Sequence, residues 1–180
     1  REEFEVFAEG LSNPWGFDFN DQGQGFATCC VIPHLFHVVQ GGIYHKQSRQ
    51  NVNRYVYDNI KTIRDHAHKS AHGGARFYLA DAFPEKYRDQ LFMCNIHQHS
   101  VLTDVMVPKG SSYVGKHGED FMPTNDLAWV GFSVEIGPIA RRLLPGAYTV
   151  RVSFERRRQT KRVVQAMGSD ADPAAVEHTL

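Results

Sequence analysis

The chain has 180 residues, 42% of them hydrophobic, and no formal net charge, which is typical of one globular domain of ordinary size. No apolar run approaches the ~20 residues of a membrane helix, so no transmembrane segment is expected. Three cysteines are too few for a disulfide scaffold. No nucleic-acid partner is expected, because no aromatic residues interleave with the basic run at 156–162. Histidine is unusually frequent, because nine of the ten histidines lie between His34 and His117.

Short alternating stretches separated by turns run through most of the chain. Residues 4–7 predict a strand, and residues 14–32 predict a β-hairpin around a tight turn at 20–23. Further strands are expected at 75–80, 90–96, 100–107, 129–136 and 146–154, with a hairpin corner at 97–99 and polar loops at 108–112 and 115–120. Turn signals every eight to twelve residues are typical of an all-β sandwich, barrel or propeller.

A repeated pattern within the sequence favours the propeller. Trp15 and Trp129 each precede a glycine and an alternating strand, and they lie 114 residues apart. That separation equals two blade-sized steps, with room for one blade between them. The sequence therefore predicts a partial β-propeller of about three blades over residues 1–138, which forms an open arc rather than a closed ring.

Residues 139–180 have a different charge balance. The first 138 residues carry 12 Lys and Arg against 16 Asp and Glu, whereas the remainder carries 8 against 4. The basic residues at 156–162 have no aromatic residues among them, which is typical of a solvated tail. We therefore expect an irregular, divergent basic tail over 139–180, foreign or frameshifted in origin, with a disordered end at 169–180. Because the chain lacks an initiator Met, we also expect it to be a piece of a longer protein.

Two stretches carry a family resemblance. NPWGFDFNDQGQGFATCCVIPHLFHVVQGG (13–42) and AHGGARFYLADAFPEKYRDQLFMCNIHQHSVLTDVMVPKGSSYVG (71–115) resemble blades of the six-bladed propellers related to soluble quinoprotein glucose and sorbosone dehydrogenases. Within that group the chain is most similar to the predicted membrane-bound dehydrogenases of planctomycetes. The likeness covers about residues 4–138 and stops after Pro138.

The resemblance implies a function for the parent protein. It implies removal of hydride from a sugar or alcohol carbon, with pyrroloquinoline quinone as acceptor and Ca²⁺ polarising the quinone. It also implies a periplasmic or membrane-associated location and a cytochrome c-like haem domain elsewhere in the parent. This chain itself has no C-x-x-C-H, hence no haem attachment motif. We expect the chain to be inactive on its own.

The stretch ATCCVIPHLFHVV (27–39) raises the first site question. Neighbouring residues of a strand face apart, so Cys29 and Cys30 are predicted to pack rather than to share a metal. His34 and His37 follow a proline and are predicted to lie at the end of a blade, where they are candidate catalytic residues. Imidazoles there could ligate a metal, contact a quinone or act as a base. An H-x-x-H pair without a third ligand, however, predicts no metal site.

The stretch HAHKSAH (66–72) holds three histidines and is followed by two glycines. In the quinoprotein dehydrogenases, a His that precedes Asn-Gly-Gly is the base that takes the substrate's hydroxyl proton. By resemblance His72 is the candidate base, although the Asn is missing here, and Gly73, Gly74 and Arg76 are candidate cofactor-binding residues. A polar surface loop is the alternative interpretation of 66–72. His117, with acidic neighbours, could help to hold Ca²⁺, but no EF-hand spacing supports this.

The preferred hypothesis is thus a fragment of a sugar or alcohol dehydrogenase-like propeller. Two alternatives remain open: a non-catalytic propeller that binds a carbohydrate or a protein partner, and a histidine-rich metal protein.

Overall fold

The computed structural model describes residues 3–46, 58–69, 71–81, 83–137, 148–156 and 159–167. The elements are β1 (Ala8–Glu9), β2 (Pro14–Phe19), β3 (Gly25–Cys29), β4 (Leu35–Val38), β5 (Gly42–Ile43), β6 (His72–Phe77), a 3₁₀ turn (Glu85–Tyr87), β7 (Gln90–Asn95), β8 (Ser100–Lys109), β9 (Ser112–Pro123), β10 (Gly131–Gly137), β11 (Tyr148–Arg156) and β12 (Gln159–Met167). These residues contain no α-helix, so the described part of the chain is all-β, and no helix in it could cross a membrane.

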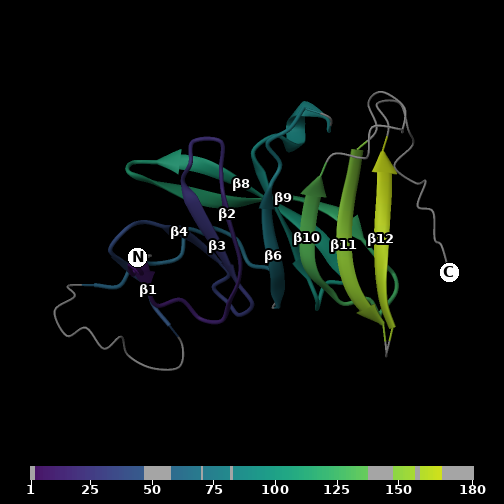
Figure 1. The fold of residues 1–180 in the computed structure, drawn as a ribbon, viewed down its shortest axis with the longest axis horizontal. Helices are drawn as coiled ribbons and strands as arrows, with labels where there is room; N and C mark the ends of the chain where they lie inside the picture. Colours follow the sequence, from purple (N-terminus) through teal and green to yellow (C-terminus); the bar gives the residue numbers. More distant parts are fainter. Residues whose placement is uncertain are drawn as a thin grey trace.

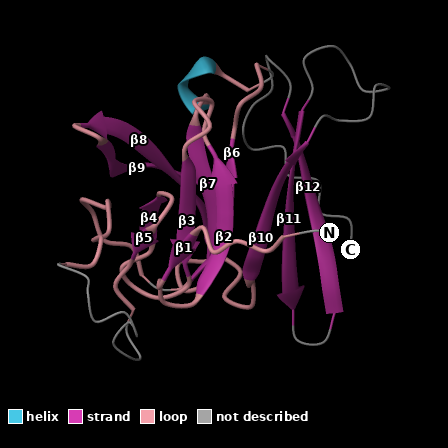
Figure 2. Ribbon diagram, turned by 60° about the vertical axis from the view of Figure 1, so that its left-hand side comes forward, coloured by secondary structure: helices cyan, strands magenta, loops and turns pink. Residues whose placement is uncertain are grey.

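Three antiparallel sheets stand side by side (Figures 1 and 2). The first has the order β2-β3-β4, the second β6-β7-β8-β9 and the third β10-β11-β12, while β1 and β5 form a small parallel pair. Each sheet is made of strands that follow one another along the chain, as expected when hairpins connect neighbours. The described strands form an open row rather than a closed ring, consistent with a propeller-like fragment (Figure 1).

The core lies between the sheets. Strand β7 reads QLFMCN, a continuous buried run typical of a strand covered on both faces. Leu91 and Met93 pack toward the first sheet, whereas Phe92 and Cys94 pack toward β10, because successive side chains point to opposite faces. The middle sheet therefore joins two hydrophobic layers, and at ~25 cal/mol per Å² their burial is the main stabilising term.

Glycines allow the sheets to approach closely. A Cβ at Gly16 would lie 2.3 Å from the backbone carbon of Gly74, and one at Gly73 would lie 2.8 Å from the carbonyl oxygen of Phe132. Gly74 has φ +71°, a conformation that favours glycine, and it faces the backbone of Val134. The structure thus places the two glycines of β6 in sheet packing, between β2 and β10.

We expect Gly16→Ala to lower the free energy of unfolding by about 1–3 kcal/mol, because the added methyl group must separate two backbones. Urea unfolding measures the change. Gly23→Asn is the matched control: Gly23 has φ +73°, which Asn tolerates, and nothing lies within 4 Å of its added Cβ. Equal losses for both variants would contradict close sheet packing as the cause.

Several predicted elements are confirmed. The hairpin over 14–32 corresponds to β2 and β3, the corner at 97–99 joins β7 to β8, and the strand predicted at 146–154 corresponds to β11. The tail predicted to be irregular forms two strands, because β11 pairs with β10 and β12 pairs with β11. The predicted disordered end at 169–180 lies outside the described residues.

Two local predictions were wrong. Residues 4–7 are not a strand, because only Ala8 and Glu9 find a partner strand, and Phe4 is 94% exposed. Residues 115–120 are not a loop but the middle of β9, which pairs with β8 along its length. Ladder hydrogen bonds to β8 thus outweigh the polar, glycine-containing composition of this stretch.

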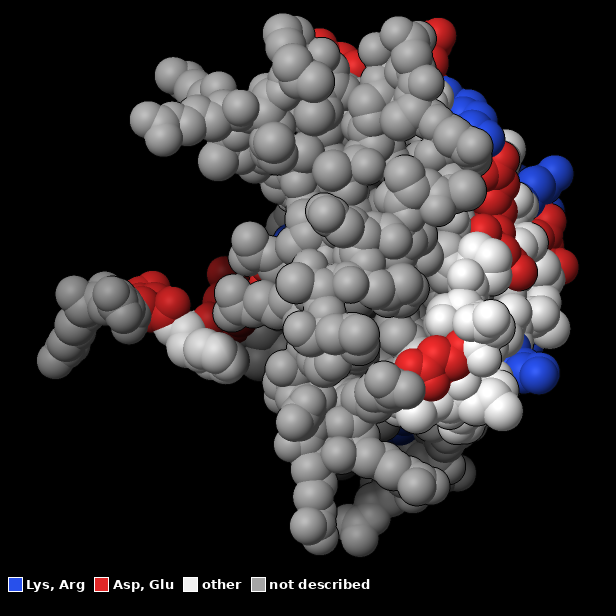
Figure 3. Space-filling model, turned by 90° about the vertical axis from the view of Figure 1, so that its right-hand side faces the viewer, with Lys and Arg blue, Asp and Glu red and all other residues white. Residues whose placement is uncertain are grey.

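Acidic and basic side chains are interspersed over the described part of the face in Figure 3.

A candidate histidine–aspartate centre

Five histidines from four parts of the chain gather around one aspartate. The set comprises His34, His66, His68, His72, His117 and Asp104. Asp104 lies in β8, and the β8–β9 register places His117 directly opposite it. His72 begins β6, and His34 immediately precedes β4. The cluster therefore forms where the first two sheets meet the segment 58–69 that links them.

The segment that carries His66 and His68 is held by backbone contacts. Ile63 donates to the carbonyl of Leu35, Gly115 donates to the carbonyl of Ile63, and Asp65 donates to the carbonyl of Gly115. The segment is thus hydrogen-bonded to β4 and to β9. His66 and His68 are two residues apart, a spacing that places both side chains on one face of an extended chain.

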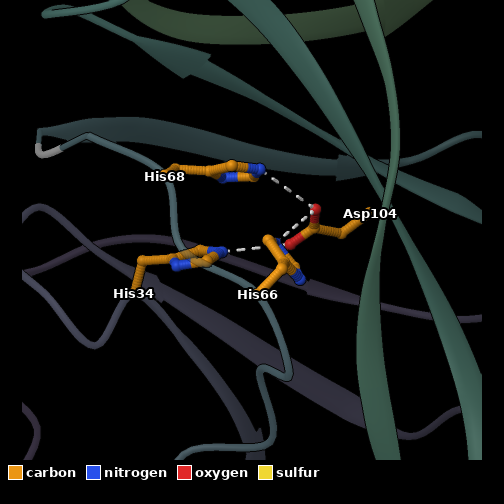
Figure 4. Close-up of side chains that lie close together, drawn as sticks. All are labelled: His34, His66, His68 and Asp104. Carbon is orange, nitrogen blue, oxygen red and sulfur yellow. Dashed lines mark hydrogen bonds and ion pairs between the residues drawn. The ribbon is translucent and has the colours of Figure 1, made fainter.

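The Asp104 carboxylate is fully buried, and contacts from three imidazoles converge on it (Figure 4). Its Oδ2 is 3.0 Å from Nε2 of His34. Its Oδ1 is 3.2 Å from Nε2 of His66, 3.9 Å from Nε2 of His68 and 3.9 Å from Nδ1 of His117. His34, His66, His68 and Asp104 each offer one ligand atom, and these four atoms lie within 4.8 Å of one another.

An outer ring of contacts holds the imidazoles. Nδ1 of His66 is 3.0 Å from the carbonyl oxygen of Gly115, and Nε2 of His117 is 3.3 Å from the Asp120 carboxylate. The His34 and His72 rings stack with centroids 4.2 Å apart. The remaining contacts join His68 to His117 (3.0 Å), His68 to His72 (3.3 Å), and His72 to the Asn95 amide (3.3 Å). Each ring is therefore held by a contact beyond Asp104.

Burial divides the cluster into an inner and an outer part. Burial lowers the pKa of His68 to about 3 and that of His72 to about 2. Burial also opposes protonation of His66, but the Asp104 carboxylate raises its pKa, and the same carboxylate raises the pKa of His117. Burial alone would raise the pKa of Asp104, yet the surrounding histidines hold it well below its usual range. His68 and His72, the inner pair, are thus neutral and lie beside the ionised Asp104 carboxylate.

Solvent reaches the cluster on one side. The side chain of His117 is 38% exposed and that of His66 is 15% exposed, whereas those of His34 and His68 are at most 4% exposed. A separate open groove of about 680 Å³ covers the outer face of the first sheet, lined by residues such as Trp15, Phe17 and Tyr44. None of the residues that line this groove belongs to the histidine–aspartate cluster.

The structure brings together some predicted site residues and leaves others apart. His34 and His72 both enter the cluster, where His72 is fully buried. His37 lies outside it: its Nδ1 is 3.0 Å from the Ser112 hydroxyl, and its Nε2 is 3.1 Å from the Gln24 amide oxygen. Arg76 lies 3.6 Å from Asp18. Gly73 and Gly74 pack against β10, as described above.

Sequence patterns did not identify Asp104, on which the cluster contacts converge. Asp104 interrupts the apolar stretch VLTDVMV, and a lone carboxylate in a buried strand is a signal that a partner must lie nearby. His66 and His68 belong to the stretch HAHKSAH, but Asp104, their partner 36–38 residues further along the chain, could not be identified from spacing alone. Among the cysteines, Cys94 packs against β10 in the core.

The cluster does not fit the Ca²⁺ that the family resemblance implies. Ca²⁺ takes about six to eight oxygen ligands, whereas this site offers imidazole nitrogens and one carboxylate. Gly73, Gly74 and Arg76 also form no quinone cradle, because the glycines face β10 and the guanidinium faces Asp18. No chemical step is therefore assigned to a bound quinone.

Comparison with known proteins supports the fold. No family model matches the chain, and no curated protein matches it. A solved structure from Thermus thermophilus, named a putative oxidoreductase (glucose dehydrogenase), is similar with a TM-score of 0.53 and 18% sequence identity. The match covers 82% of this chain and 40% of that chain. The chain thus shares the fold of the matching part of that protein and spans about 40% of its length.

Proposed function

We propose that this chain forms part of an oxidoreductase that removes hydride from the hydroxyl-bearing carbon of a sugar or alcohol. The likeness of its fold to a protein named as a glucose dehydrogenase supports the reaction class. The observation that carries the proposal is the gathering of five histidines around one buried carboxylate. Such a centre can accept a proton and stabilise the positive charge that results.

Oxidation of a hydroxyl-bearing carbon needs a proton acceptor. As the O–H and C–H bonds break, the carbonyl forms, the proton passes to a base, and the hydride passes to a two-electron acceptor. His117 is the cluster histidine most open to solvent, and Asp120 holds its Nε2. The Asp104 carboxylate, 3.9 Å from Nδ1, stabilises the imidazolium. We therefore place the substrate hydroxyl at His117 and not at the enclosed His72.

The test is hydroxyl-dependent reduction of an artificial electron acceptor by the full-length natural protein that contains these residues. We expect a panel of sugars and alcohols to include substrates, and His117→Gln to lower kcat by about 10²–10⁴-fold. His97→Gln, at an exposed histidine of the β7–β8 turn, is the control and should retain activity. Absence of reduction with every substrate would refute the oxidoreductase proposal. Full activity of His117→Gln would refute the assigned role.

A further inference from the structure

The proton on His66 is fixed by its outer contact. The carbonyl oxygen of Gly115 can only accept, so Nδ1 of His66, 3.0 Å away, must carry a hydrogen. In the neutral ring Nε2 then presents a lone pair to Oδ1 of Asp104, at 3.2 Å. Both atoms are buried and neither has a hydrogen-bond partner. Two acceptors therefore face each other with no donor between them.

The proton on His68 is fixed by a longer chain of contacts. The Asn95 side-chain oxygen accepts from the backbone amides of His97 and Gln98, so its amide nitrogen faces His72. That nitrogen donates to Nε2 of His72, which is consequently an acceptor for Nδ1–H of His68 as well. Nε2 of His68 is left with a lone pair, 3.9 Å from Oδ1 of Asp104 and 3.0 Å from Nδ1 of His117. The Asp120 carboxylate accepts the hydrogen on Nε2 of His117, 3.3 Å away, so Nδ1 of the neutral His117 ring has no hydrogen to donate to His68.

His34 completes the arrangement from the other side of the carboxylate. Its Nε2 lies 3.0 Å from Oδ2 of Asp104 and donates to it, which leaves Oδ1 directed at His66 and His68. Three electron-pair donors, two nitrogens and one oxygen, thus converge in a buried place. One extra proton could satisfy one pair of them, whereas a single cation satisfies all three.

We infer that His66, His68 and Asp104 bind one divalent transition-metal ion, through Nε2, Nε2 and Oδ1. Two imidazoles with one carboxylate are the ligand set of many Zn²⁺ and non-haem Fe²⁺ sites that keep open positions. Bonds of about 2.0–2.1 Å place tetrahedral ligand atoms roughly 3.3 Å apart. The separations of 3.2 and 3.9 Å from Oδ1 are close to that value.

The contacts around these three residues are those of a metal site. Each ligating imidazole donates its other N–H, His66 to a backbone carbonyl and His68 to His72, and the carboxylate accepts from His34. Such contacts fix the ring tautomer and orientation. His117, whose side chain is 38% exposed, lies beside the three proposed ligands, with its Nδ1 3.0 Å from Nε2 of His68. This site goes beyond the proposed function, because metal binding does not require that the protein oxidise a hydroxyl group.

The test is titration of tag-free, chelator-treated protein with Zn²⁺, Co²⁺ and Ca²⁺. We expect one Zn²⁺ per chain by calorimetry, visible d–d bands of low-coordinate Co²⁺, and no Ca²⁺ binding. Asp104→Asn and His68→Gln should weaken Zn²⁺ binding by at least about 100-fold. His37→Gln is the matched control, since His37 is a buried histidine near the cluster that contacts Ser112 and Gln24 instead.

The outcomes separate this proposal from the proposed function. Absence of stoichiometric Zn²⁺ and Co²⁺ binding by the wild-type chain would overturn the metal site, whatever the result of the acceptor-reduction assay. Equal binding by wild type, Asp104→Asn and His68→Gln would also overturn it. Far-UV circular dichroism of the metal-free variants excludes unfolding as the cause of lost binding, and His37→Gln shows that loss of a buried histidine is not sufficient.

Discussion

Asp104→Ala is expected to lower the free energy of unfolding by about 3–5 kcal/mol. The carboxylate is fully buried, accepts from His34 and supports the positive charge that His66 can carry. Without it, buried imidazoles lose their common partner and a cavity remains, two effects that act in the same direction. Urea unfolding in the presence of a chelator measures the change. The chelator is needed because a metal bound to the folded protein would add to the measured free energy of unfolding.

The control for this prediction is Asp120→Ala. The Asp120 side chain is 49% exposed and touches the same cluster through His117, so its removal should change stability by less than about 0.5 kcal/mol. A loss below about 1 kcal/mol for Asp104→Ala would show that the cluster contributes little to folding. The presence of Asp104 in a buried strand would then be explained by function and not by stability.

The metal-free protein is expected to lose stability as the pH falls from about 6.5 to 4. His68 and His72 have folded pKa values of about 3 and about 2, so in this window they bind protons only when unfolded. Their stabilising contribution is complete above about pH 6.5 and is lost on acidification, at up to about 1.4 kcal/mol per pH unit for each ring. Below the usual Asp range, protonation of Asp104 adds to the loss, because its folded pKa is lowered.

His66 and His117 act in the opposite direction. Their folded pKa values are raised, so their contribution is complete below about pH 6.5 and is lost as the pH rises through the folded values. The expected profile therefore has its maximum near neutral pH and falls more steeply on the acid side. Urea midpoints across about pH 4–8 measure it, and His72→Gln should reduce the acid slope by about half. A flat profile over the acid half of this range would mean that the inner histidines are protonated in the folded protein.

The metal proposal and the acid–base proposal share Asp104 and otherwise use different histidines of one cluster. His66, His68 and Asp104 present lone pairs to a common point, whereas His117 lies on the solvent side with Asp120 behind it. A substrate that entered from the His117 side would meet both groups. This arrangement explains how one cluster can be buried on the inside and still be chemically accessible on the outside.

The sequence by itself determined the local structure. Alternation of apolar and polar residues identified most strands, and the turn at 20–23 identified the first hairpin, because these signals depend on residues close together in the chain. The repeated Trp-containing stretch indicated several similar sheets. Local signals failed at residues 4–7, where alternation found no neighbouring strand to pair with, and at 115–120, where β8 supplied one.

Only the tertiary structure decided the site. The stretch HAHKSAH was compatible with a surface loop, and Asp104 stood alone in an apolar strand. Their encounter depends on the β8–β9 register and on the way segment 58–69 crosses between two sheets, both long-range outcomes of packing. The tautomers that turn three lone pairs toward one point depend in turn on Gly115, His72 and Asn95. Sequence spacing carries none of this information, because the partners are brought together by the fold.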